Sequence, residues 1–80
     1  MKWSNYNCPV SNGAAKEALP RMGDFVEIVC EANCGRYRIT GTAMGTIRYQ
    51  EPKVRRALLE SAKAVAAADN REVPIITSYL

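Results

Sequence analysis

The chain has 80 residues, of which 48% are hydrophobic and 24% charged, and it carries a formal net charge of +3 with three cysteines and no histidine. A chain of this size can build only one small core, and this balance of apolar and charged residues excludes a globally disordered protein. It contains no apolar run of the roughly 18 to 20 residues that span a bilayer, and the lack of an apolar secretion signal leads us to expect a cytoplasmic protein without a membrane partner.

Residues 1–22 are polar and are interrupted by Pro9, Gly13 and Pro20, so we expect a loop-rich segment. Within it, "SNGAAKEAL" favours at most one short helical turn, with Ser11 as its cap.

Residues 24–40 predict a β-hairpin, because "DFVEIVCE" and "RYRIT" alternate with the period of a strand. Between them, Asn33 and Gly35 tolerate the positive φ that closes a tight turn. In the first strand, Val26, Ile28 and Cys30 should face one side and Phe25, Glu27 and Val29 the other. In the second, Tyr37 and Ile39 should face one way and Arg36 and Arg38 the other.

The next segment, "TGTAMGTIRYQ", is ambiguous, because Thr40 or Thr42 could cap a short helix that Gly45 would weaken. A long amphipathic helix is then predicted over 52–69, with Pro52 in its first turn and Asn70 as a left-handed cap. Its apolar stripe should contain Val54, Leu58, Ala62 and Val65, with Leu59 and Ala66 beside it.

Residues 72–80 are rich in β-branched side chains, and Pro74 limits them to an edge strand or an extended tail. Two interpretations stay open. The segment completes the protein's own sheet, or it offers an exposed edge to a partner protein or to a second copy in a homodimer.

Cys8, Cys30 and Cys34 are the residues with the clearest chemistry. An odd number of cysteines in a reducing cytosol argues against a disulfide framework. Paired cysteines followed by glycine, as in Cys34 and Gly35, are typical of the hairpin tips that present thiolates to zinc.

The motifs "CPVS" and "CGRYRITGTA" carry a resemblance to small bacterial zinc-ribbon-like domains, which read C-P-x-C and then C-P-x-C-G-x-Y-x-I-[ST]-G-T-A. The resemblance covers residues 8–43. It implies a zinc-ribbon hairpin in which Cys8, Cys30 and Cys34 occupy three ligand positions. Ser11 replaces the fourth ligand, and the second pair has three intervening residues instead of two, so the site is degenerate.

Three interpretations of the cysteines follow. They are buried small hydrophobic residues without a metal, or three zinc ligands completed by water, Glu31 or a partner chain's cysteine, or redox groups. A cysteine–histidine nucleophile is excluded, because the chain lacks histidine.

Positive charge is concentrated between Arg36 and Arg56, where six basic residues and one acid give a net +5, whereas the remainder has five basic and seven acidic residues. With Tyr37 and Tyr49 interleaved, this segment could contact nucleic acid, or it could be an ordinary solvated surface. The proposed contacts are Arg36, Arg38, Arg48, Lys53, Arg55 and Arg56.

We therefore expect a single α+β domain over residues 1–80, with the hairpin, one long helix and a C-terminal strand. No phosphate-binding loop or pair of carboxylates indicates catalysis, so no catalytic residue is assigned and the protein is predicted not to be an enzyme. A binding module, with nucleic acid as the leading partner, is the first functional hypothesis. A protein-interaction or structural module is the second, and a zinc-binding protein is the third.

Overall fold

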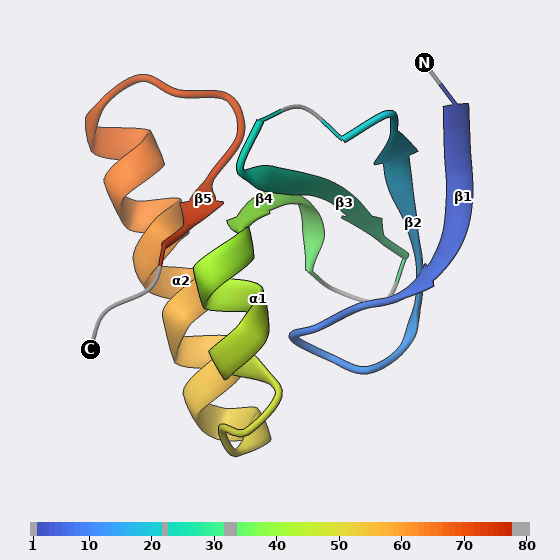
Figure 1. Cartoon of the computed structure of the whole chain (residues 1–80). Coiled ribbons are helices and arrows are strands. Elements are labelled where there is room, and N and C mark those ends of the chain that lie inside the picture. Colours follow the sequence, from blue (N-terminus) through green and yellow to red (C-terminus); the bar gives the residue numbers. More distant parts are fainter. Residues whose placement is uncertain (1, 22, 32–33, 78–80) are drawn as a thin grey trace.

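The β3–β4 hairpin is the centre of the structure, a computed structural model that describes residues 2–21, 23–31 and 34–77 (Figure 1). β3 (Phe25–Cys30) and β4 (Gly35–Thr40) pair antiparallel, with Ile28 opposite Tyr37. Gly35 has the predicted positive φ, 72°, whereas Asn33 lies outside the described residues. Pairing of the two strands brings one apolar side of each onto a common face, whose five members are all buried: Val26, Ile28, Cys30, Tyr37 and Ile39.

The prediction that residues 1–22 are loop-rich was wrong. β1 (Lys2–Asn7) and β2 (Ala14–Leu19) form a second antiparallel hairpin, and β2 pairs with β3 through Ala15 opposite Cys30. The sequence "AAKEAL" has helical propensity, but pairing on both sides outweighs it. Ser11 accordingly caps no helix and lies in the loop between the two strands.

The described residues form one five-stranded sheet in the order β1-β2-β3-β4-β5. β5 is short (Ile75–Ile76) and pairs parallel to β4, with Ile76 opposite Ile39. Pro74 lies just before β5, where its carbonyl oxygen accepts a hydrogen bond from the Arg38 backbone N–H at 2.8 Å. The C-terminal segment thus adds an edge strand to the protein's own sheet, and residues 78–80 lie outside the described part.

Two helices follow the central hairpin in the part of the chain that is described. α1 (Gly41–Ile47) begins where the ambiguous segment begins, because the Thr40 side chain caps it by accepting from the Ala43 backbone N–H at 3.2 Å. α2 spans Pro52–Ala68, close to the predicted 52–69, and Asn70 follows it with a φ of 58°.

The apolar stripe predicted for α2 is rotated relative to the buried face. Leu59, Ala62 and Ala66 are buried, whereas Val54 is 37% and Val65 is 53% exposed. An alanine-rich helix offers several possible stripes, so the neighbouring elements decide which one is buried.

The core lies between one face of the sheet and the helices, and it joins Ile28, Ile39, Ile47 and Leu59. Figure 1 shows α1 and α2 gathered near β4 and β5, with the β1–β2 hairpin at the other end of the sheet. Among the described residues, no helix is both long and apolar enough to cross a membrane. The molecule is thus a small α+β domain, as predicted.

Candidate metal centre

The three cysteines come together although they belong to three separate segments. Cys8 lies at the start of the loop after β1, Cys30 is the last residue of β3, and Cys34 directly precedes β4. Their Sγ atoms all lie within 4.8 Å of one another, and the residues are 0%, 4% and 1% exposed. All three are thiols. Antiparallel pairing of β2 with β3 and of β3 with β4 brings the three segments to the same end of the sheet.

The spacing of the sulfur atoms suits a tetrahedral metal ion. The Sγ atoms of Cys8 and Cys34 are 3.7 Å apart. Zinc–sulfur bonds of about 2.3 Å in a tetrahedron place two sulfur atoms roughly 3.8 Å apart. The Cys8–Cys34 distance and the sulfur donors are therefore compatible with a metal ion such as zinc.

Ser11 lies where the resemblance places the fourth ligand. Its Oγ is 3.4 Å from the Cys30 Sγ, and its backbone N–H donates to the Cys8 Sγ at 3.4 Å. The Ser11 Oγ also accepts from the Gly13 backbone N–H at 3.2 Å. A neutral hydroxyl is a weaker zinc ligand than a thiolate, so this corner of the cluster is its weakest.

The backbone on both sides of the cluster turns in the same way. Asn12 follows Ser11 with a φ of 64°, and Gly35 follows Cys34 with a φ of 72°. Each left-handed residue directs the chain from the sulfur-bearing turn into the next strand or loop. Although the pair has three intervening residues, the Sγ atoms of Cys30 and Cys34 both lie in the cluster.

Tyr37 is a member of the cluster that the sequence interpretation missed. Its hydroxyl lies 3.0 Å from the Cys8 Sγ, and the residue is fully buried. Burial, followed by the hydrogen bond with Cys8, raises the pKa of Tyr37, so the phenol stays neutral. The alternation that places Tyr37 beside Ile39 on the inner face was the available signal.

The electrostatics of the cluster favour the thiol form in the absence of a cation. Burial, and next the proximity of Cys8, raise the pKa of Cys34 to about 11. A metal ion must therefore displace protons from the sulfur atoms, and it would supply the positive charge that buried thiolates need.

The suggested fourth ligand Glu31 is not part of the cluster. Among the described Cys, Asp and Glu residues, the group whose ligand atoms lie together consists of the three cysteines. Glu31 is exposed.

The six basic residues predicted to contact nucleic acid do not lie on one element. Arg36 and Arg38 are on β4, and each donates through Nε to the nearly buried carboxylate of Glu27, at 2.7 and 3.0 Å. Arg48 follows α1, and the remaining three are on α2: Lys53, Arg55 and Arg56. Tyr37, expected to lie among these residues, is buried on the other face of the sheet and cannot stack on a base.

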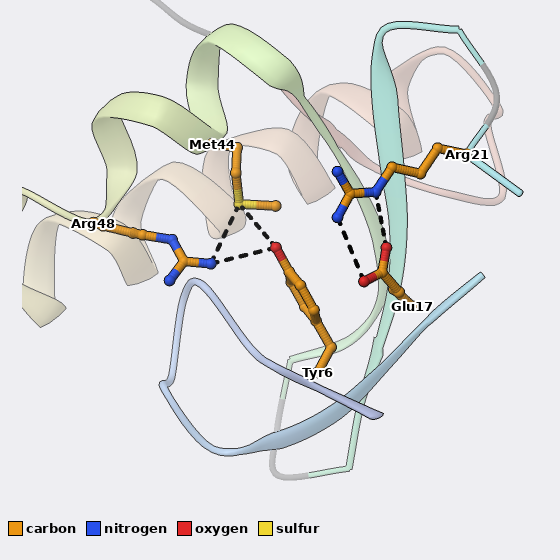
Figure 2. Close-up of polar contacts among 5 residues, drawn as sticks. All are labelled: Tyr6, Glu17, Arg21, Met44 and Arg48. Atoms are coloured by element: carbon orange, nitrogen blue, oxygen red, sulfur yellow. Dashed lines mark hydrogen bonds and ion pairs between the residues drawn. The ribbon is translucent and has the colours of Figure 1, made fainter. Parts of the chain in front are cut away.

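Arg48 belongs to a second polar cluster, which joins the β1–β2 hairpin to α1 (Figure 2). Its guanidinium donates to the Tyr6 hydroxyl at 3.3 Å, and that hydroxyl donates to the Met44 Sδ at 3.8 Å. Close by, the Arg21 Nε donates to the Glu17 carboxylate at 2.9 Å. The hydrogen bond and charge of Glu17 raise the pKa of Arg21. The Tyr6 contacts thus connect β1 to α1, whereas the Arg21–Glu17 pair lies beside β2.

Comparison with known proteins identifies no relative: no family model, curated protein or solved structure matches this chain. The resemblance to zinc-ribbon-like domains therefore stays a prediction, and the functional argument depends on the geometry of the site.

Proposed function

We propose that this protein is a small zinc-binding module, in which Cys8, Cys30 and Cys34 hold one structural ion. The observation that carries the proposal is the convergence of three buried sulfur atoms, within 4.8 Å of one another, from three segments. Three thiols are a donor set with high affinity for zinc.

The ion would join the loop after β1 to both ends of the β3–β4 turn. A crosslink of this kind stabilises a small domain, because a preformed site does not exist in the unfolded chain and the binding free energy becomes folding free energy. The fourth ligand would be a water molecule or the Ser11 hydroxyl, whose Oγ already lies 3.4 Å from the Cys30 Sγ.

We propose a structural and not a catalytic ion, because the sulfur atoms are buried and the chain has no histidine for acid–base chemistry. The interpretation of the cysteines as redox groups has less support. The raised pKa of Cys34 disfavours the reactive thiolate.

The direct test is to purify the protein under reducing conditions without chelator and to measure its zinc content and its thermal unfolding. We expect about one zinc per chain and a lower Tm after a strong chelator is added. Zinc-free protein whose Tm does not respond to added zinc or to chelator would overturn the proposal, and the thiols would then be packing groups.

A second measurement keeps the test valid if cysteine variants fail to fold. Cobalt(II) added to the wild-type apoprotein should give a thiolate-to-metal charge-transfer absorption with the intensity of three sulfur ligands. The variant Cys34→Ser should show two sulfur ligands or none, and Ser61→Ala, on the exposed side of α2, should match the wild type.

The basic segment and the C-terminal edge stay as predictions of partner binding. The nucleic-acid hypothesis needs a surface on which cations and aromatic side chains lie together, and one part of the sheet offers such a surface.

A further inference from the structure

In the described part of the chain, the buried residues of α1 and α2, such as Ile47 and Leu59, pack on one face of the sheet, so the helices leave the opposite face uncovered. Cross-strand pairing defines this face, which we call the outer face: Asn5 is opposite Lys16, Lys16 is opposite Val29, and Val29 is opposite Arg36. A second row runs from Trp3 and Ala18 to Glu27 and Arg38. The side chains of Ile28 and Tyr37 point the other way, into the core.

Two aromatic side chains lie on the outer face. Trp3, the only tryptophan of the chain, is 44% exposed on β1. Phe25 begins β3 and is partly exposed, with the guanidinium carbon of Arg38 positioned 4.9 Å from its ring centroid. A large exposed aromatic side chain next to arginine is the composition of surfaces that stack nucleic-acid bases.

The outer face also has an excess of positive charge. Within the paired strands, Lys16, Arg36 and Arg38 are opposed by one carboxylate, Glu27, which both arginines share, and exposed Glu31 follows β3. One carboxylate cannot use all ten N–H donors of two guanidinium groups. The Arg36 side chain is 53% exposed, so part of its guanidinium faces solvent in an orientation that Glu27 holds.

A hollow opens on the outer face beside these cations. Pairing of β2 with β3 is limited to Ala15–Glu17 opposite Ile28–Cys30, and beyond it the strands separate. The lining of the hollow includes both apolar and charged groups, among them Ala18, Phe25, Arg21, Glu27, Arg36 and Arg38.

We propose that the outer face binds single-stranded nucleic acid, with bases stacked on Trp3 and beside Phe25 and with phosphates bound by Lys16 and Arg36. Charge complementarity selects a polyanion, and exposed aromatic rings select one with unpaired bases. A duplex is not selected, because its bases are stacked inside and the described face has no protruding helix to enter a groove. This surface is distinct from the cysteine cluster, because the three cysteines lie in the core on the other side of the sheet.

The first experiment titrates the wild-type protein with a single-stranded oligonucleotide of mixed sequence, about 12 nucleotides long, and follows the fluorescence of Trp3. We expect quenching and an affinity that falls several-fold or more between 50 and 200 mM salt, as roughly expected for a few phosphate contacts. Absence of both quenching and binding would overturn the proposal. So would equal or tighter binding of the matching duplex.

Matched variants then locate the surface by the anisotropy of a labelled oligonucleotide. Lys16→Ala and Arg36→Ala should each weaken binding several-fold, and Trp3→Ala should weaken it about tenfold. Lys53→Ala and Arg71→Ala remove the same charges from the α2 side and should change binding less than about twofold. Equal losses in both sets would overturn the assignment to the outer face, because charge alone would then explain the binding.

Two further controls complete the design. Circular dichroism and thermal unfolding of each variant exclude loss of fold as the cause. An acidic peptide of the same length and charge as the oligonucleotide should not quench Trp3. If the peptide bound more tightly than the oligonucleotide, the proposal of nucleic acid would be overturned in favour of a protein partner.

Discussion

The β3–β4 hairpin is built from alternating apolar residues, whereas the β1–β2 hairpin has few of them and depends on its contacts with other elements. Ile28, Tyr37 and Ile39 are fully buried, but all of β1 is exposed or only partly buried. The fully buried anchors of the first hairpin lie in its loop, at Cys8 and Val10, and β2 adds the small buried side chains of Ala15 and Ala18. Large apolar side chains along both strands thus hold the central hairpin, whereas the first hairpin depends on its loop, on the pairing of β2 with β3 and on a few polar contacts.

Metal removal should give the largest difference in local stability between the two hairpins. We expect chelation of the zinc-bound protein to accelerate amide hydrogen exchange in Lys2–Asn7 and Ala14–Leu19 far more than in the central strands. The reason is that the metal would be the main link between the loop at Cys8 and the rest of the fold.

Hydrogen–deuterium exchange read by mass spectrometry checks this expectation. Cys34→Ser is the matched control, because without its site the chelator should have no further effect. Equal acceleration in both hairpins would contradict the idea that the loop anchors only the first one.

The second prediction concerns a variant that should strengthen the metal link between the loop at Cys8 and the rest of the fold. Ser11→Cys would place a fourth sulfur next to Cys30, from which the Ser11 Oγ is 3.4 Å away. We expect tighter zinc binding by at least the roughly 10- to 100-fold that changes around metal ligands produce. Competition with a chromophoric chelator measures the affinity.

Ser61→Cys is the control, because it adds a thiol on the exposed side of α2, away from the cluster. If Ser11→Cys bound zinc no more tightly than this control, the fourth corner would not be at Ser11.

The third prediction concerns the outer face of the central hairpin. Burial alone would raise the pKa of Glu27, but hydrogen bonds from Arg38 and Arg36 outweigh it and lower the pKa below its usual range. Because the pKa of Glu27 is lower in the folded protein than in the unfolded chain, the ionised carboxylate stabilises the fold at pH values above the unfolded-state pKa, near 4.5. That contribution is lost as the pH falls through the lower folded pKa.

Glu27→Gln should therefore cost about 1–3 kcal/mol of unfolding free energy at pH 7, and less at pH 3. Urea unfolding at the two pH values measures the difference. Glu60→Gln, an exposed partner of Lys63 at 3.6 Å, should cost under about 1 kcal/mol at pH 7. A cost for Glu27→Gln that did not change with pH would contradict the ion-pair explanation.

The smallest effect is expected at the polar contact of the first hairpin. Tyr6→Phe removes the hydroxyl that accepts from Arg48 and donates to the Met44 sulfur. We expect a loss of about 0.5–1 kcal/mol, because the site is partly solvated. Thermal unfolding measures it, with Tyr49→Phe, at an 88% exposed position, as the control. A loss above about 2 kcal/mol would mean that Tyr6, and not the loop, anchors the hairpin.

The inner face of the β3–β4 hairpin could be read directly from the alternation of Val26, Ile28, Tyr37 and Ile39, because burial on one face imposes a period of two. The long helix was also predictable from Pro52 and Asn70, which define its ends through local backbone preferences. The sequence likewise singled out Cys8, Cys30 and Cys34.

Only the tertiary structure decided the rest. "AAKEAL" becomes a strand because β1 and β3 pair with it, which outweighs a helical propensity of at most a few tenths of a kcal/mol per residue. The hydroxyl of Tyr37 and the side chain of Ser11 join the sulfur cluster because strand register and loop path place them there. Spacing along a chain limits local conformation, whereas the neighbours of a side chain depend on how distant segments pack, and here that packing defines both the cysteine site and the outer face.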